Sequence, residues 1–238
     1  MEYYYAPPEK RHGDTLLIDG QEFLHLSQVM RKAPGDRLTA VDGCGTAYAV
    51  AIREIAHRTA YCDILETMPR LHEPETEVTL GVALLKHGAS FDYLVEKVTE
   101  LGVSRIVPLL TQRTVRRHGR EARWEHLALA AMKQCGRCLL PAILPVTTFA
   151  EFLQGFPPES VKCIPHEKIL EPLIGTTLKE LGTGQAALAI GPEGGFTEEE
   201  VDAAVLAGFR VVSLGPRRLR TETAAAVAVW AAVCAGQT

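Results

Sequence analysis

The sequence is short of several features that define whole classes of protein. Only 6% of its 238 residues are aromatic, and its formal net charge is −4, so the chain as a whole has no basic field to attract nucleic acid. Its longest apolar run, 224–235, is far shorter than the about 20 residues that a membrane-spanning helix needs. The opening stretch MEYYYAPPEK lacks the basic-then-apolar order of a secretory signal. We therefore expect a cytoplasmic protein of one large or two small domains.

Signature motifs of common catalytic and metal sites are also absent. The sequence has no P-loop, no H-E-x-x-H and no G-x-S-x-G. Six cysteines include one CxxC pair, Cys135 and Cys138, but no second pair completes four zinc ligands. Free, scattered thiols are typical of a reducing compartment, so we expect structural thiols and no metal. A G-x-G-x-x-A match at 182–187 precedes a predicted strand, whereas a dinucleotide-binding turn must follow one, and we reject it.

Positive charge is concentrated in one segment of this acidic protein. Between Arg105 and Arg137 there are eight Lys or Arg residues and only two acids, Glu121 and Glu125. A local basic strip of this kind fits a polyanionic partner. A solvated helix face is an equally open interpretation.

Residues 1–70 are predicted to form a small β-barrel with one helix. Short alternating stretches such as TLLID and RLTAVDG are typical of strands, and the dipeptides Asp19-Gly20 and Asp42-Gly43 are typical of hairpin turns. A helix is predicted between these dipeptides and before Pro34-Gly35, from apolar residues at helical spacing: Phe23, Leu24, Leu26, Val29 and Met30.

The polar segment 70–77 marks the expected boundary, which divides the chain into domains 1–70 and 74–238. After it, strands alternate with helices. Strands are predicted in EVTLGVALL, SRIVPLL, VKCIPH, AALAIG and RVVSLG, and helices at 91–101 and from about 121 to 136. This alternation predicts a parallel sheet covered on both faces.

Unusual loops follow three of these strands, at the ends where open α/β sheets bind ligands. They are PHE (165–167), GPEGG (191–195) and GPRRLRTET (215–223). The glycines expose backbone groups to an approaching molecule, and Thr197 and Glu200 have the spacing of a helix capping box. One such loop is commonly only a tight turn into a helix, but two at neighbouring strands favour a nucleotide-like ligand.

These loops also carry a family resemblance. IGPEGGFTEEEV and SLGPRRLRTETA resemble the two C-terminal motifs of the ribosomal RNA small subunit methyltransferase E family, in the SPOUT superfamily. Three upstream stretches agree, so the resemblance covers nearly the whole chain: HLSQVMRKAPGDRLTAVDGCG, EKVTELGVSRIVPLLTQRT and KQCGRCLLP. It implies an N-terminal PUA-like RNA-binding β-barrel, a C-terminal α/β domain with a parallel sheet and a trefoil knot, and a homodimer.

The activity implied by the resemblance is methyl transfer. S-adenosylmethionine is the implied methyl donor, and N3 of a specific uridine in 16S ribosomal RNA, within the small subunit, is the implied acceptor. Two alternatives stay open: a SPOUT methyltransferase acting on another RNA, and an RNA-binding ribosome-assembly factor without turnover.

The resemblance also implies roles for individual residues. The donor is expected against Ile190, Gly191, Gly195, Leu214, Gly215, Leu219 and Thr221. Arg217 and Arg220 are expected to stabilise negative charge on the base, with Glu193 or Glu222 accepting the proton or holding an arginine. RNA phosphates are expected at Arg31, Arg113, Arg116, Arg117 and Arg137.

The last helix and several departures complete the comparison with the family. The small residues Ala224, Ala225, Ala226, Val227 and Val229 suit a helix threaded through a loop of its own domain. The chain departs from many relatives at Arg218, Gln112, Lys133 and Ser90, which bears on local RNA contacts and loop packing.

Overall fold

The structure is a computed structural model that describes residues 3–180 and 184–235. The chain forms two compact units, Met1–Glu73 with Leu129–Leu140, and Pro74–Ala128 with Pro141–Thr238. The expected division into 1–70 and 74–238 differs from this in the segment 129–140, which packs with the N-terminal unit. Residues 182 and 183, which open the rejected G-x-G-x-x-A match, lie outside the described residues.

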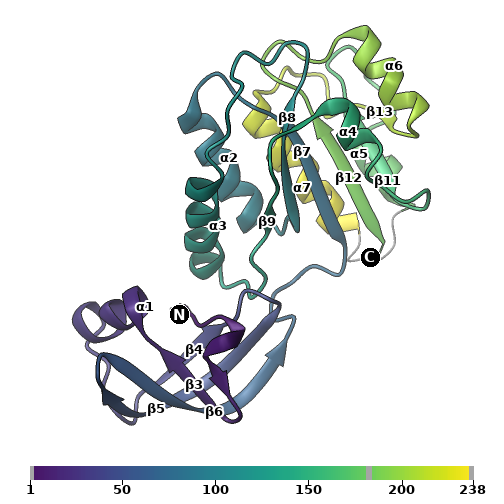
Figure 1. Ribbon diagram of the computed structural model, residues 1–238. Coiled ribbons are helices and arrows are strands. Elements are labelled where there is room, and N and C mark those ends of the chain that lie inside the picture. Colours follow the sequence, from purple (N-terminus) through teal and green to yellow (C-terminus); the bar gives the residue numbers. More distant parts are fainter. Residues whose placement is uncertain (1–2, 181–183, 236–238) are drawn as a thin grey trace. The chain divides into compact units, whose positions relative to one another are not determined.

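The N-terminal unit is built on a six-stranded sheet (Figure 1). Its elements are β1 (Tyr3–Tyr5), β2 (Arg11–His12), β3 (Thr15–Ile18), α1 (Gly20–Leu24), β4 (Arg37–Val41), β5 (Thr46–Ala56) and β6 (Thr59–Pro69), with a 3-10 turn at Pro8–Lys10 and a π-helical turn at His25–Val29. The strand order is β1-β4-β5-β6-β3-β2, and only the β1–β4 pair is parallel. The predicted β-rich unit with one helical segment is therefore confirmed.

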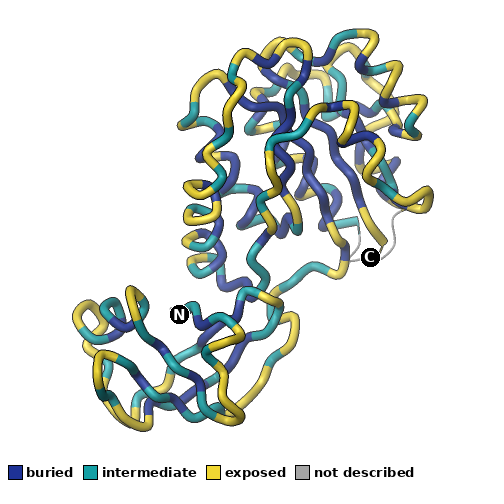
Figure 2. The backbone as a smooth tube through the Cα atoms, viewed as in Figure 1, coloured by how far each residue is buried: buried dark blue, intermediate teal, exposed yellow. Residues whose placement is uncertain are grey.

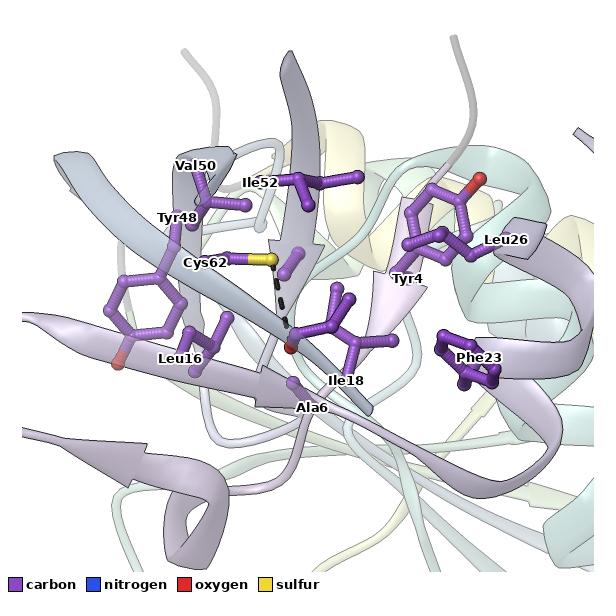
Figure 3. Packing of buried hydrophobic residues seen from close by; sticks show 12 residues of the cluster. Tyr4, Ala6, Leu16, Ile18, Phe23, Leu26, Tyr48, Val50, Ile52 and Cys62 are labelled. Carbon is purple, nitrogen blue, oxygen red and sulfur yellow. Dashed lines mark hydrogen bonds between the residues drawn. The ribbon is translucent and has the colours of Figure 1, made fainter. Parts of the chain in front are cut away.

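Alternating side chains of this sheet form the core of the unit (Figure 3). Leu16 and Ile18 of β3 are fully buried, while Leu17 between them is only partly buried. The helix contributes Phe23 and Leu26 to this core. The other predicted members of its apolar stripe fit less well, since Val29 and Met30 are exposed.

The helical segment ends at Val29, with Met30 as its C-cap, so it spans the predicted stripe. Arg31 adopts a left-handed conformation with φ of 53°, and the backbone N–H of Lys32 bonds back to the carbonyl of Leu26. This is the geometry of a helix C-terminus. Val29 and Met30 therefore lie at the exposed C-terminal end of the helical segment.

Of the two predicted hairpin turns, one is correct. Asp42-Gly43 joins the antiparallel strands β4 and β5, and the Asp42 carboxylate accepts the backbone N–H groups of Cys44 and Thr46. Asp19-Gly20 instead begins α1, so the hairpin prediction there is wrong. The Asp19 side chain pairs with Lys10 rather than closing a turn.

A buried ion pair joins the segment 129–140 to the rest of the N-terminal unit. The Arg137 guanidinium donates to the Glu73 carboxylate at 2.7 and 3.0 Å, and both side chains are at most 4% exposed. The other oxygen of Glu73 accepts the backbone N–H groups of Cys138 and Leu139, both at 2.8 Å. The carboxylate is thus fully hydrogen-bonded, which is the condition for burying a charge at acceptable cost.

The second unit has an all-parallel sheet. Its elements are β7 (Glu77–Ala83), α2 (Gly88–Glu100), β8 (Arg105–Leu110), α3 (Glu121–Cys135, whose last turns belong to the first unit), β9 (Ala142–Ile143), β10 (Thr147–Thr148), α4 (Phe149–Leu153), β11 (Val161–Pro165), α5 (Ile174–Leu178), β12 (Gln185–Ile190), α6 (Glu198–Leu206), β13 (Arg210–Val212) and α7 (Thr221–Ala235). The strand order is β10-β8-β7-β12-β11-β13, with β9 beside β8, and every pair is parallel. All five predicted strands and both predicted helices are present.

Helices cover both faces of this sheet. Successive residues of β7 and β12 are therefore buried on both sides, as in other all-parallel sheets (Figure 2). Ala187 and Ala189 of β12 belong to an aromatic-rich cluster with α4 and α6. The opposite face of β12 and β7 packs against α7, which also contacts α2 and α5. At the centre, Gly81 leaves room for the Phe152 ring, which a Cβ atom would approach to 2.4 Å.

The last helix, α7, is only partly enclosed. Ala225 and Val229 of the predicted packing set are buried, together with Ala228 and Ala232, whereas Val227 is exposed. Within the described residues, no helix has the length and apolar character needed to cross a bilayer.

The buried ion pair gives a stability prediction. Replacing Arg137 with Ala strands the Glu73 carboxylate in the core, so Arg137→Ala should lower the free energy of unfolding by about 3–5 kcal/mol. The matched control is Arg53→Ala, which breaks the half-exposed Arg53–Asp63 pair of the same unit and should cost at most about 1 kcal/mol. Urea unfolding followed by circular dichroism measures both, and equal small losses would contradict the assignment.

Candidate functional site

The carboxyl ends of three parallel strands meet at one cavity. Strand β11 pairs with both β12 and β13, so the loops that follow these strands lie side by side. The cavity has a volume of about 880 Å³, which is within the usual range for a site that encloses a small molecule. All the residues expected to bind the donor line it: Ile190, Gly191, Gly195, Leu214, Gly215, Leu219 and Thr221.

The first wall is the glycine turn 191–196 between β12 and α6. Gly195 has a φ of 71°, and its N–H donates to the Pro192 carbonyl at 2.8 Å. At Gly191 an added Cβ atom would lie 3.1 Å from the Phe196 ring, so a side chain there would crowd the turn. The predicted capping box is confirmed, because Thr197 and Glu200 exchange side-chain to backbone hydrogen bonds at the start of α6.

The second wall is the turn 213–220 between β13 and α7. Gly215 has a φ of 103°, which favours glycine, and its N–H donates to the Ser213 hydroxyl at 3.1 Å. The buried Thr221 then opens α7, and its hydroxyl donates to the Gly191 carbonyl at 3.2 Å. This bond joins the two turns directly.

Two arginines of the second turn carry charge that the described residues leave uncompensated. Arg217 and Arg220 are exposed at the cavity, and neither forms an ion pair within the described part of the chain. Their neighbour Arg218 differs, since its Nε donates to Glu167 at 3.1 Å. The departure at Arg218 therefore adds a surface ion pair between the turn 213–220 and the PHE loop (165–167).

The two candidate glutamates have different surroundings. The Glu193 carboxylate accepts the backbone N–H of Lys86 at 3.0 Å, which ties the glycine turn to the loop after β7. Glu222 lines the cavity from the first turn of α7 and is only partly exposed. The sequence left the roles of Glu193 and Glu222 open. In the structure, Glu193 has a hydrogen bond that supports the glycine turn.

The basic strip does not form a continuous cationic surface. Asp92 pairs with Arg120 and Arg123, Glu77 with Arg105, and Glu22 with Lys133. These acids lie outside the segment 105–137. Counting charges along that segment alone therefore overestimates its net positive charge. The departure at Lys133 is likewise explained by its ion pair within the N-terminal unit.

The arginines predicted to bind RNA fall into three groups. The prediction for Arg137 is wrong, because its guanidinium is buried against Glu73 and cannot reach a phosphate. Arg113 contacts two backbone carbonyls of the glycine turn. Arg117 and Arg31 are exposed and Arg116 is partly exposed, and none of these three has a carboxylate partner among the described residues.

Sequence reasoning missed the part of the cavity that follows β7. His87 and Ser90 line it from the start of α2, yet Ser90 was noted only as a departure and His87 was not singled out. The sequence did contain a sign of this third loop. As at the other two, a glycine, Gly88, lies between a buried strand and a helix. The PHE loop was anticipated, and Pro165, His166 and Glu167 do line the cavity.

The cysteines are free thiols. Burial raises the pKa of Cys138 to about 11, and its thiol bonds to the Leu71 carbonyl, so it has the character of a structural group. Cys135 is partly exposed at the end of α3. No arrangement of three or more His, Cys, Asp or Glu side chains suited to a metal ion occurs in the described residues.

Comparisons with known proteins agree along nearly the whole chain. An RNA methyltransferase domain model matches residues 72–233, and an RNA methyltransferase PUA domain model matches residues 18–65. The chain is 34% identical to ribosomal RNA small subunit methyltransferase E of Synechocystis sp. over 93% of its own length and 74% of that protein. It is 27% identical to the Bacillus subtilis protein of the same name over 94% of its own length and 93% of that protein.

Solved structures give the same result. The ribosomal RNA small subunit methyltransferase E of Neisseria gonorrhoeae, bound to S-adenosyl methionine, superimposes with a TM-score of 0.86 at 32% identity over 96% of this chain and 95% of that one. A Legionella pneumophila protein in complex with the same cofactor gives 0.79 at 28% identity, with 96% and 95% covered. The predicted parallel α/β methyltransferase domain and PUA-like β-barrel are confirmed, and the chain belongs to the ribosomal RNA small subunit methyltransferase E family of RNA methyltransferases.

Proposed function

We propose that this protein methylates N3 of a specific uridine in 16S ribosomal RNA, with S-adenosylmethionine as the methyl donor. One observation carries the proposal: the turns 191–196 and 213–220 form a single cavity, joined by the Thr221–Gly191 hydrogen bond, in a chain of this family. The similar structures from Neisseria gonorrhoeae and Legionella pneumophila both contain S-adenosylmethionine, and each aligns with 96% of this chain.

The cavity suits the donor chemically. Backbone N–H and carbonyl groups of the glycine turns can read the polar edge of an adenine ring, as nucleoside sites commonly do. Ile190, Leu214 and Leu219 add apolar surface beside these groups. When bound, S-adenosylmethionine supplies an electrophilic methyl group on a sulfonium sulfur.

The chain's own contribution to the reaction is electrostatic. N3–H of uridine lies between two carbonyl groups, so loss of its proton spreads negative charge onto both oxygens. Arg217 and Arg220, which no described carboxylate neutralises, can donate to those oxygens and favour the deprotonated base. Glu193 or Glu222, which both line the cavity, is proposed to accept the proton or to hold an arginine; Glu193 has Oε2 available for this, since the Lys86 N–H bonds to its Oε1.

RNA recognition is proposed for the exposed arginines. Arg116 and Arg117 lie in the loop between β8 and α3, in the same unit as the cavity. Arg31 belongs to the N-terminal unit, where a PUA domain model matches. The target base has to leave its stack to reach the cavity, at a cost of a few kcal/mol that these phosphate contacts offset.

A homodimer is proposed from the exposed side of α7. Val227 is 39% exposed and Trp230 is 54% exposed, one turn apart on a helix that also borders the cavity. Large apolar side chains that share one helix face in this way are typical of a protein–protein contact. A second copy of the chain is the partner that the family resemblance implies.

The function has a direct test. Small subunits from a strain that lacks this modification are incubated with the purified protein and labelled donor, and the methylated base is then mapped. One N3-methyluridine in 16S ribosomal RNA is expected. Donor binding without methylation would favour the assembly factor, and labelling of transfer RNA in a parallel reaction would favour the other SPOUT activity.

Arg220→Ala tests the electrostatic role. Removing one preorganised donor to the charged base should lower kcat about 10²–10³-fold. Donor affinity, measured by calorimetry without RNA, should change little, because the donor-facing groups are mainly backbone. The neighbouring Arg218→Ala is the matched control and should reduce kcat far less, since Arg218 is paired with Glu167. A collapse of donor affinity in Arg220→Ala would show that this side chain has been misassigned.

Trp230→Glu tests the homodimer. A charge on the exposed face of α7 should convert the dimer to a monomer of 26.0 kDa in sedimentation equilibrium, without loss of helix content. Arg210→Ala, a change in an exposed ion pair of the same unit, should leave the dimer intact. A dimer that survives Trp230→Glu would place the contact elsewhere.

A further inference from the structure

The glycine turn of the cavity is held from behind by the loop after β8. The backbone N–H of Gln112 donates to the Glu200 carboxylate at 2.7 Å, and the other oxygen of Glu200 accepts the Thr197 N–H at 2.9 Å. Glu200 is only 7% exposed, so these bonds lie largely out of water. The next residue, Arg113, donates from Nη1 to the carbonyl of Gly194 at 2.6 Å and to that of Phe196 at 3.3 Å.

Together these bonds form a closed ring around the turn. The Phe196 carbonyl and the Thr197 N–H belong to one planar peptide group, which Arg113 holds at the oxygen and Glu200 at the nitrogen. The Gly194 carbonyl shares a peptide plane with the N–H of Gly195, a residue expected to bind the donor. Arg113 and Glu200 therefore hold the peptide group between Phe196 and Thr197 from both sides, and Arg113 alone holds the one between Gly194 and Gly195.

The loop that supplies Arg113 has hydrogen bonds of its own. The Thr111 N–H donates to the Thr114 hydroxyl at 3.0 Å, the two threonine hydroxyls are 2.8 Å apart, and both side chains are buried. A guanidinium mounted on such a loop can impose geometry on a glycine-rich turn, whose own backbone has little conformational preference.

We propose that Arg113 and Glu200 are positioning residues for the methyl-donor pocket, and that Arg113 contributes to affinity for the donor rather than to affinity for RNA. The proposal rests on the proposed function, and it revises the expectation that Arg113 binds a phosphate. Its physical basis is preorganisation. Without the hydrogen bonds from Arg113 and Glu200, part of the free energy of donor binding is spent on ordering the glycine turn.

Donor binding measured by calorimetry in the absence of RNA separates this role from a phosphate contact. Arg113→Ala should raise the donor Kd at least about tenfold, as expected for loss of a hydrogen bond to a charged group. Glu200→Gln should have a similar effect, because an amide can accept one of the two N–H groups but turns its own donors toward the other. Arg113→Lys, which can still donate to a carbonyl, should recover part of the affinity.

Steady-state kinetics and RNA binding supply the readouts that a general loss of structure would not give. In Arg113→Ala the KM for the donor should rise while kcat at saturating donor stays within about twofold, and the salt dependence of RNA binding should be unchanged. In Arg117→Ala, the matched arginine without a described partner, the donor Kd should be unchanged and the salt slope should fall by about 0.7. Arg210→Ala should alter neither quantity.

The outcomes are distinguishable from failure of the proposed function. If the unaltered protein does not bind S-adenosylmethionine, the proposed function fails. If it binds and Arg113→Ala binds equally well but with a reduced RNA salt slope, the positioning role is overturned and the phosphate contact is restored. Should Arg113→Ala not fold, the Arg113→Lys variant decides, since unchanged donor affinity together with weakened RNA binding would likewise overturn the proposal.

Discussion

Parallel pairing of β11 with both β12 and β13 is the constraint on which the candidate site depends. It brings the carboxyl ends of strands that are distant in sequence to one edge of the sheet, and their three loops then share one cavity. The Thr221–Gly191 hydrogen bond converts two neighbouring turns into a single wall, because it ties the start of α7 to the end of β12. Without that register, the arginines of the second turn would face solvent with no base to act on.

The site combines flexible residues with rigid supports. Glycines at 191, 194 and 195 let the backbone approach a ligand closely, and such a segment would be costly to order on its own. The surrounding side chains supply that order: Glu193 holds the turn to Lys86, Glu200 holds it to Gln112, and Arg113 holds two of its carbonyls. Charge that stays uncommitted, on Arg217 and Arg220, is then available to the substrate.

Much of this arrangement could be predicted from the sequence, because strand periodicity and loop composition are local properties. Five strands, two helices and the capping box at Thr197 were predicted correctly, and every donor-binding candidate lines the cavity. Charge pairing could not be predicted, since the partners of Arg137, Arg123 and Lys133 lie 64, 31 and 111 residues away. For the same reason the packing of the segment 129–140 against Tyr3 and Val41 could not be predicted, although the RNA methyltransferase domain model, like the predicted division, includes this segment. The trefoil knot is a prediction from the family resemblance alone, since general rules of chain connection would exclude it.

A crystal structure of the protein with S-adenosylmethionine would show directly whether the two turns form one donor site. We expect the adenosine to lie between the turns 191–196 and 213–220, against backbone groups of Gly195 and Gly215, with Arg217 and Arg220 at the open side of the cavity. A donor molecule bound at another place, or an empty cavity at a donor concentration that supports methylation, would contradict the claim that these two turns form one binding site.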